Sequence, residues 1–536
     1  MEQNQFIKYA SNATLTENGA LSNASTFSAI ADQFGKAGNY RARPISLVFD
    51  DQEALWNENP EYALRFPFYL RAITRKTKLG EKNMAQKGQG QRDEAFKRLL
   101  WLAKFHSETF EKNIYLLPFI GSWKDLWQLM YYDEALKTNC IDRTRIYGII
   151  ADGLGTEGCS ELVKKFMPRI KSGGKCKTEW TKFMNKFAKE FASLLKMSYK
   201  EYNHVKSNGT AHDFQKLICS QQYDKLNFGK IPGRALTLLS NSKFLENHDL
   251  TDKFIEWVLN SDSAKFTGYV YELAAACRKS NKKHVHMLSD KQFDELIAKA
   301  KDNAEGGIQG NVWCALDTSG SMRDQINGTN VTALDMCLSL GIFFSTLNTG
   351  AFHKNVIMFD DVSKVKQLKG TFSEMVDQLV HATTAWGSTN FQSVVNEIVR
   401  IRRARPEIPL EDYPQTLLVV SDMQFNPSET YNWYDGDSYN AEQTKTNMQK
   451  AIEKLKAVFP DDFVDEFKFI WWDCTSRKSD YPATIEDTGN YFYSGFDGSI
   501  ITQLLGGEMK EKKERPSMEE VIEMALNQEI FKLLVL

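Results

Sequence analysis

The sequence predicts a helical first half joined to a doubly wound α/β second half. From about residue 46 to 305, apolar residues recur at helical spacing, most clearly in 94–110, 177–197 and 250–261. From about residue 308, short apolar and β-branched runs alternate with helical segments. Strand alternating with helix is typical of a parallel sheet whose two faces are covered by helices. The 536 residues have room for two or three domains of ordinary size.

The helical half is expected to form an α-solenoid. Its amphipathic segments between residues 46 and 305 are joined by short loops, and no convincing strand interrupts them. Stacked helical units of this kind build solenoids, although no clear repeat period is visible here. Residues 1–45 are rich in Asn, Ser, Thr and Ala, and we predict that they form an extended lead-in to this domain.

The α/β half is predicted to span residues 308–508. The expected strands are 311–316, 355–359, 416–420, 467–472 and 490–496, and the expected helices are 331–347, 391–403 and 442–459. The strands lack strict alternation of apolar and polar residues, which is typical of strands buried on both faces. Residues 363–368 are predicted to form a short antiparallel edge strand. Residues 515–536 contain an amphipathic helix from Ser517 onward, and its apolar end, LLVL, is expected to pack back on the body.

Composition excludes several classes of protein. No window approaches the ~18 apolar residues of a membrane span, and the first ten residues lack the apolar run of a signal peptide. The eight cysteines contain no CxxC pair, so neither a zinc framework nor a disulfide pattern is predicted. Free thiols are typical of a reducing compartment, and we expect a cytoplasmic protein. The net charge of −2 argues against a uniformly basic coat, but balanced totals permit local basic patches.

Oxygen-bearing side chains are predicted to meet at the carboxyl ends of three strands or their loops. Asp317, Ser319 and Ser321 follow the first strand in ALDTSGSM, and Asp422 follows the strand at 416–420. Thr389 lies in WGSTNF, just before a helix. Ligands of open α/β sheets bind at this end of the strands. A shell of oxygens alone suits a hard divalent cation, with Mg²⁺ expected and Mn²⁺ or Ca²⁺ as alternatives.

The same residues carry a resemblance. DTSGSM, followed by Thr389 and Asp422, resembles the metal-ion-dependent adhesion site (MIDAS) of von Willebrand factor A (vWA) domains, over roughly residues 308–508. The resemblance implies that the serines and the threonine contact the metal ion, while the aspartates often act through water. It also implies that an acidic side chain of a protein partner completes the shell. Asn390 departs from the pattern, because relatives often carry Asp there, and its presence removes a nearby charge.

The helical half resembles the Ro ribonucleoprotein family. The segments that carry the resemblance are GQGQRDEAFKRLLWLA (88–103), LLPFIGSWKDLWQL (116–129) and FGKIPGRAL (228–236), while residues 15–34 are nearer to poorly characterised relatives. The resemblance implies a TROVE module over residues 46–305, a ring of HEAT-like helix pairs closed by the vWA domain. Such proteins bind small noncoding RNAs on a basic outer surface and pass single-stranded ends through the hole. A ring that closes within one chain favours a monomer.

Two basic runs are candidates for RNA binding. The first contains Arg75, Lys76, Lys78, Lys87 and Arg92 in a Gly- and Gln-rich stretch predicted to be a loop, and the second contains Lys164, Lys165, Arg169, Lys171 and Lys175. Neutralising phosphates with such groups supplies most nonspecific affinity for nucleic acid. Taken alone, a run of charge is more often a solvated face. Trp123 and Trp127 could stack on bases, but we expect them to pack between helices.

No catalytic motif is visible in the sequence. It lacks a Walker A loop, a GxSxG elbow and an HExxH helix, and a two-metal nuclease would need more than two carboxylates. We therefore expect a non-enzymatic, Ro-like RNA-binding protein whose metal site docks a partner protein. The alternative is a protein-interaction or assembly component that uses the metal site without binding RNA.

Overall fold

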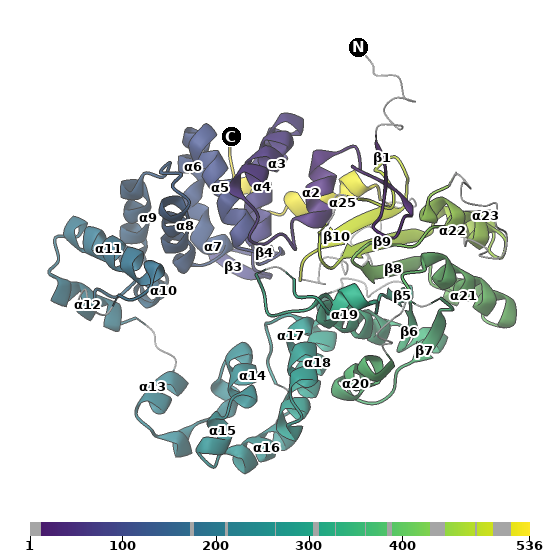
Figure 1. Cartoon of the computed structure of the whole chain (residues 1–536). Helices are drawn as coiled ribbons and strands as arrows, with labels where there is room; N and C mark the ends of the chain where they lie inside the picture. The colour runs from purple at the N-terminus through teal and green to yellow at the C-terminus, as the bar shows by residue number, and fades with distance from the viewer. Residues whose placement is uncertain are drawn as a thin grey trace. The chain divides into compact units, whose positions relative to one another are not determined.

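The computed structural model describes most of the chain in two compact units. The described residues are 12–171, 176–209, 213–262, 264–303, 310–326, 328–359, 361–382, 388–428, 445–477, 480–496 and 516–536. Unit 1 comprises Met1–Arg41 and Asn227–Glu523, and unit 2 comprises Ala42–Leu226 and Met524–Leu536 (Figure 1). The division at Leu226 differs from the predicted domain boundary near residue 305, because the helices that follow Leu226 pack with helices of the α/β half.

Six strands of unit 1 form one sheet within the described residues. They are β5 (Trp313–Leu316), β6 (Asn355–Met358), β7 (Lys364–Gln367), β8 (Thr416–Ser421), β9 (Lys468–Asp473) and β10 (Asn490–Ser494). Their order is β10-β9-β8-β5-β6-β7, and every neighbouring pair is parallel except β6 with β7. Every predicted strand of this half is confirmed, including the antiparallel edge strand. From β5 the chain continues to β6 and β7 on one side of the sheet, and from β8 it continues to β9 and β10 on the other. The strand order therefore reverses between β5 and β8.

Helices cover the sheet as the pattern predicts. They are α19 (Ala333–Leu347), α20 (Phe372–Ala382), α21 (Phe391–Ala404), α22 (Asn447–Lys456) and α23 (Asp461–Asp465), with short 3₁₀ turns η5 (Gly320–Arg323), η6 (Gly350–Phe352) and η7 (Leu410–Asp412). Helix α19 packs against β5, β6 and β8. Thr332 begins α19 with a capping box, in which its hydroxyl accepts the Asp335 N–H. The aromatic rings of Phe391 on α21 and Trp471 on β9 lie 5.2 Å apart.

The helices before the sheet also belong to unit 1. They are η4 (Phe228–Lys230), α14 (Gly233–Asn241), α15 (Phe244–Asn247), α16 (Thr251–Asn260), α17 (Val270–Lys279) and α18 (Lys283–Asn303). Arg278 of α17 donates to both carboxylate oxygens of Asp335 on α19, at 2.7 and 3.0 Å. Asp290 of α18 accepts the backbone N–H of Ser373 on α20 at 2.7 Å. These contacts attach α17 and α18 to the α/β half.

The N-terminal segment is not an extended lead-in. It forms the hairpin β1 (Ala13–Leu15) and β2 (Leu21–Asn23), followed by helix α2 (Ala29–Lys36), which begins at a Ser28 cap. Helix α2 lies beside the edge strand β10 (Figure 1). A Cβ on Gly35 would lie 2.8 Å from the Cβ of Phe492, so this approach depends on glycine. The segment therefore covers the edge strand β10. Its composition, rich in small polar residues, does not predict this role.

Unit 2 is mostly helical. Its elements are α3 (Ile45–Glu58), α4 (Pro60–Arg71), β3 (Arg75–Leu79), β4 (Lys82–Gln86), α5 (Asp93–Phe105), α6 (Ser107–Asn113), η1 (Ile114–Leu116), α7 (Leu117–Ile120), α8 (Trp123–Ala135), α9 (Arg143–Gly155), α10 (Ser160–Phe166), α11 (Glu179–Leu194), α12 (Tyr199–Ser207), α13 (Asp213–Cys219) and η3 (Tyr223–Lys225). The single helix predicted over 94–110 is two, because His106 leaves the helical conformation between α5 and α6.

The hairpin of β3 and β4 corrects the expectation that this half lacks strands. Its strands pair antiparallel around Gly80, which has a φ of 60°. Thr77 and Met84 are buried opposite each other, while Lys76 and Lys78 point the other way and are exposed. The charged residues obscure the alternation that marks a strand, so the pattern predicts a loop where the hairpin lies.

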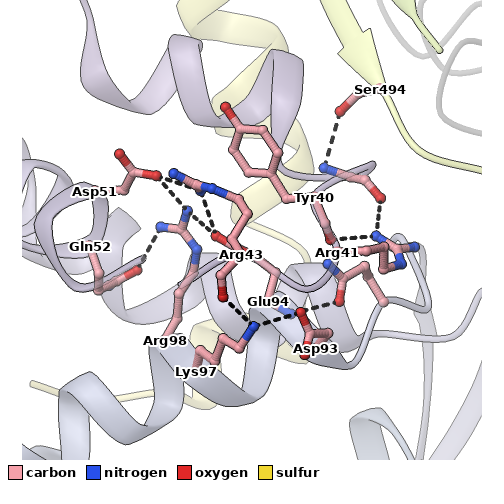
Figure 2. Close-up of polar contacts among 12 residues, drawn as sticks. Tyr40, Arg41, Arg43, Asp51, Gln52, Asp93, Glu94, Lys97, Arg98 and Ser494 are labelled. Atoms are coloured by element: carbon pink, nitrogen blue, oxygen red, sulfur yellow. Dashed lines mark hydrogen bonds and ion pairs between the residues drawn. The ribbon is translucent and has the colours of Figure 1, made fainter. Parts of the chain in front are cut away.

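A buried ionic network holds the first helices of unit 2 together (Figure 2). Arg98 on α5 is buried, donating to Glu94 at 2.9 Å and to Gln52 on α3 at 3.1 Å. Arg43 donates to Asp51 at 2.7 Å and to Glu94 at 3.2 Å. The charges in RDEAFKR therefore serve largely to pack helices, which accounts for part of this basic run.

The C-terminal helix is shorter than predicted. Helix α25 (Met518–Leu526) is followed by the 3₁₀ turn η9 (Phe531–Leu533) rather than continuing to residue 536. The chain end packs on unit 2, as expected. Leu534 is buried, and the backbone N–H and C=O of Val535 bond the side chain of Asn113 at 2.9 and 2.6 Å. In the described part of the chain, no helix combines the length and apolar character needed to span a membrane.

Candidate metal centre and basic surfaces

Two predicted metal ligands lie where the strand order of the sheet reverses. Asp317 directly follows β5, and Asp422 directly follows β8, the neighbouring parallel strand. The N–H of Asp317 donates to the carbonyl of Val420 at 3.0 Å, so the two strand ends remain paired up to the site. Asp317 is fully buried and Asp422 is 6% exposed. In open α/β sheets this position is where ligands bind.

The two serines join these carboxylates. The backbone N–H of Ser319 donates to Oδ1 of Asp317 at 2.9 Å, and the Ser319 and Ser321 hydroxyls lie 3.1 Å apart. The Ser321 hydroxyl lies close enough to Asp422 to lower the pKa of that carboxylate. Oδ2 of Asp317 accepts the Ser421 hydroxyl at 2.6 Å. Four of the five predicted ligands are therefore brought together, and Ser421, immediately before Asp422, is a contact that the motif did not indicate.

Thr389 approaches the site through its backbone. It is buried, and its carbonyl accepts the N–H of Asn426 at 2.9 Å, which holds its loop against the loop after β8. Among the described residues, no hydrogen bond joins its hydroxyl to the other four predicted ligands. Asn390, the departure from the MIDAS pattern, caps α21 by accepting the Ser393 N–H at 3.1 Å. Asn caps helices as well as Asp does, so this substitution keeps the local fold.

The site brings two buried carboxylates close together. Burial raises the pKa of Asp317, with hydrogen bonds from Ser421 and Ser319 opposing the rise. Burial and then the nearby Asp317 raise the pKa of Asp422 to about 6. Over the ranges that the structure describes, no Lys, Arg or His forms an ion pair with either carboxylate. Two adjacent buried carboxylates are unfavourable unless a cation or a proton compensates them.

The donor set suits a hard cation better than a soft one. The described residues contain no group of three or more His, Cys, Asp or Glu side chains placed to hold a metal ion. A MIDAS-type shell would instead combine two carboxylates with hydroxyls and water, which suits Mg²⁺ or Mn²⁺. A third carboxylate, Asp473 at the end of β9, is bound to the ammonium of Lys36 at 2.7 Å and is therefore already compensated.

Cysteines lie buried beneath this site. The thiol of Cys337 on α19 lies 3.3 Å from the carbonyl oxygen of Asp317. Burial, and then the neighbouring charge of Asp317, raises the pKa of the Cys337 thiol well above its usual range, and burial does the same for Cys474. Thiolate is the reactive form, so burial and a raised pKa both suppress their chemistry.

Thiol labelling should separate these cysteines from an exposed one. Cys219 is exposed, and we expect it to react with a disulfide reagent such as dithionitrobenzoate within minutes at pH 8 in the native protein. Cys314, Cys337 and Cys474 should react only after denaturation. Mass spectrometry of the labelled peptides measures the order. Rapid labelling of Cys337 in the native state would contradict the packing beneath the site.

The residues of the first basic run are exposed except for Lys87, but Arg75 and Arg92 also form hydrogen bonds within unit 2. Arg75 donates to the carbonyls of Phe119 and Gly121, both at 2.9 Å, and Arg92 donates to the buried carboxylate of Asp125 at 3.3 Å. Lys76 and Lys78 lie on the exposed face of the β3–β4 hairpin. Lys87 is half-buried, and its backbone bonds the side chain of Gln528 at 2.7 and 3.0 Å. Lys76 and Lys78 are thus the clearest phosphate-binding candidates of this run.

The second basic run gathers on α10 and the loop after it. Arg169 and Lys171 are exposed, and Lys164 and Lys165 are half-buried, while Lys175 lies outside the described residues. Lys206 of α12 joins them by donating to the carbonyl of Lys164 at 3.1 Å and to that of Lys165. Burial lowers the pKa of Lys206, and the nearby charges of Arg169 and Lys165 lower it further. We call Lys164, Lys165, Arg169, Lys171 and Lys206 the α10 cluster.

Glycine permits the close contact that builds the α10 cluster. A Cβ on Gly209 would lie 2.5 Å from the backbone nitrogen of Lys165. The sequence does not indicate that Lys206 belongs to this group, because it lies 42 residues after Lys164 in a segment with no basic run. The tryptophans near this region pack as expected: Trp123 and Trp127 are buried, and the ring of Trp127 lies 5.7 Å from that of Phe191.

Two comparisons with known proteins give matches, one to a family model and one to a viral protein. Residues 311–532 match the model of a family described as "Domain of unknown function (DUF7788)". The chain is also similar to the uncharacterized protein L728 of Acanthamoeba polyphaga mimivirus, at 24% identity over 537 residues, covering 93% of this chain and 85% of the viral protein. The DUF7788 match contains all five candidate metal ligands. Neither description names an activity.

Proposed function

We propose that this chain is a Ro-like RNA-binding protein whose vWA-type MIDAS docks a protein partner through a divalent cation. The RNA would bind on unit 2, where the α10 cluster lies. The cation would bind at Asp317, Ser319, Ser321 and Asp422 in unit 1, with Thr389 approaching from its own loop. The bound cation would act as a Lewis acid that accepts one further oxygen ligand, which the partner supplies as a carboxylate.

The α10 cluster is the observation that carries the RNA proposal. Lys206 donates to the carbonyls of Lys164 and Lys165 and so lies near the like charges of Lys165 and Arg169; burial and then these charges lower the pKa of Lys206. A surface that holds like charges together stabilises an anionic ligand, because the ligand relieves their repulsion. Phosphates spaced along a nucleic acid backbone are such a ligand. The exposed Lys76 and Lys78 of the hairpin in the same unit supply a second point of contact.

Charge reversal in the α10 cluster tests RNA binding. We expect Arg169→Glu/Lys171→Glu to weaken binding of single-stranded RNA at least tenfold, because two phosphate contacts are lost. The dependence of log K on log salt concentration should also become shallower, by about 0.7 for each lost contact. Fluorescence anisotropy across a salt series measures both quantities. The matched control is Lys104→Glu/Lys112→Glu, which makes the same change in net charge on α5 and α6 of unit 2. Equal loss in the control, or wild-type affinity no better than ~10⁻⁴ M at physiological salt, refutes the proposal.

Partner docking without RNA is the second candidate, favoured by the engagement of Arg75 and Arg92 in structural contacts. On this hypothesis the purified protein carries no nucleic acid and forms a complex that depends on Asp317. The ratio of absorbance at 260 and 280 nm distinguishes the two candidates. A high ratio that falls after nuclease treatment supports RNA binding, and a protein-like ratio together with an Asp317-dependent complex supports docking alone.

A further inference from the structure

The loop after β8 contains a residue in the left-handed backbone conformation. Met423, next to Asp422, has a φ of 66°, a conformation that side chains other than glycine adopt at a cost. Its N–H donates to the Ser421 hydroxyl at 3.0 Å, and its carbonyl accepts the N–H of Phe425 at 3.0 Å. Such a turn persists only where its surroundings fix it, and the direction of the Asp422 carboxylate depends on this turn.

Gln424 connects the turn to its surroundings through both its backbone and its side chain. Its backbone N–H donates to Oδ1 of Asp422 at 3.3 Å. Its side-chain Nε2 donates to Oδ2 of Asp480 at 3.0 Å, and its Oε1 accepts the backbone N–H of Glu17 at 2.7 Å. Its carbonyl accepts Nδ2 of Asn18 at 2.5 Å. Gln424 is 7% exposed, so these bonds are shielded from water.

The N-terminal hairpin supplies one side of this framework. Residues 16–19 form the turn between β1 and β2 in unit 1. The hydroxyl of Thr16 donates to the carbonyl of Phe425 at 2.6 Å and accepts the N–H of Ala20 at 2.9 Å. With Glu17 and Asn18, the turn holds two consecutive residues of the β8 loop. Segments about four hundred residues apart in the sequence thus fix the loop beside Asp422.

A buried ionic group supplies the other side. Asp480, which accepts from Gln424, lies 3.7 Å from the ammonium of Lys36, and that ammonium is bound to Asp473 at 2.7 Å. Lys36 compensates these carboxylates, so they do not compete with Asp317 and Asp422 for a cation. Gln424 therefore connects the loop that carries Asp422 to the N-terminal hairpin directly and to helix α2 through Asp480.

We propose that Gln424 is a positioning residue for the cation site, holding the Asp422 carboxylate in its binding orientation through the N-terminal hairpin and Asp480. The inference rests on the proposed cation site. It makes the N-terminal segment a working part of that site, although the MIDAS motif contains none of its residues. Groups that orient metal ligands in this way typically contribute 10–100-fold to metal affinity.

The test measures Mn²⁺ binding to the full-length protein by electron paramagnetic resonance. We expect Gln424→Leu to weaken Mn²⁺ binding 10–100-fold, because the side chain can no longer hold Glu17 and Asp480. Asn18→Ala should weaken it by a smaller factor. The reference is Asp290→Asn, which weakens the cap of α20 elsewhere in unit 1. We expect this reference to lower the melting temperature in EDTA while leaving the Mn²⁺ affinity unchanged, so lost affinity is separated from lost stability.

Each outcome decides between the two proposals. Wild-type binding with weakened Gln424→Leu and an unaffected reference supports the positioning role. Wild-type binding with an unchanged Gln424→Leu overturns the positioning role and leaves the cation site standing. A loss in Gln424→Leu that the reference shares in proportion to its melting temperature assigns the effect to folding and overturns the inference. Absence of Mn²⁺ binding by the wild type overturns the cation site and the inference together.

Discussion

Replacing Lys36 with Met is expected to lower the free energy of unfolding of unit 1 by about 3–5 kcal/mol. Lys36 is buried, and its ammonium is bound to Asp473 at 2.7 Å and to the carbonyl of Asp480 at 3.1 Å. Removing the ammonium leaves two carboxylates buried near each other without a counter-charge. That loss far exceeds the value of an exposed ion pair, which is about 0–1 kcal/mol.

Chemical denaturation followed by tryptophan fluorescence measures this change. The control is Lys265→Met, which removes an exposed lysine of unit 1 and should change stability by about 0.5 kcal/mol or less. The double variant Lys36→Met/Asp473→Asn should recover part of the loss, because it removes one of the stranded charges. A Lys36→Met protein as stable as the control would contradict the buried pair.

The pH dependence of this pair has a definite sign. Burial lowers the pKa of Lys36, but Asp473 and Asp480 outweigh burial and leave the pKa above its ordinary value of 10.5. The stabilisation is therefore fully present below pH 10.5 and is lost as the pH rises through the higher folded-state pKa. Wild type and Lys36→Met should differ in stability at neutral pH and converge in strongly alkaline solution.

The sheet was predictable because burial on both faces of a strand requires a recognisable run of apolar residues in the sequence. Strands such as β8 contain short runs of consecutive apolar residues between polar loops, and these runs are too short for typical helices. The β3–β4 hairpin contains no such apolar run. It buries little beyond Thr77 and Met84, so its charged residues dominate the pattern. The N-terminal segment was mispredicted for a similar reason, since small polar residues there bond to distant backbone.

The candidate site was predictable at its ligands but not around them. Asp317 and Asp422 follow strands that topology brings together, so their convergence could be inferred from the strand ends. Gln424 and Lys36 act through tertiary contacts that no local spacing records. The same limit applies to the basic runs, since nothing in the sequence indicates that Arg75 donates to two carbonyls of the fold.

Replacing Asp317 with Asn is expected to abolish divalent cation binding at the MIDAS-type site. The loss should exceed the 10–100-fold effect of a group outside the ligand shell, because Asp317 supplies half of the buried negative charge. The apoprotein should still fold. Burial raises the pKa of Asp317, so the ionised carboxylate is itself unfavourable there, and Asn retains an oxygen for the Ser319 N–H and an amide beside Ser421.

Stability with and without metal ion provides the measurement for Asp317→Asn. Mg²⁺ at a hundred times its Kd should raise the free energy of unfolding of the wild type by about 2.7 kcal/mol and leave the variant unchanged. Asp324→Asn is the matched control, because Asp324 lies three residues after Ser321 but is exposed and bound to Arg477 at 3.0 Å. It should respond to Mg²⁺ as the wild type does. If Mg²⁺ stabilised Asp317→Asn fully, the cation would bind elsewhere on the chain, and neither the docking proposal nor the role of Gln424 would survive.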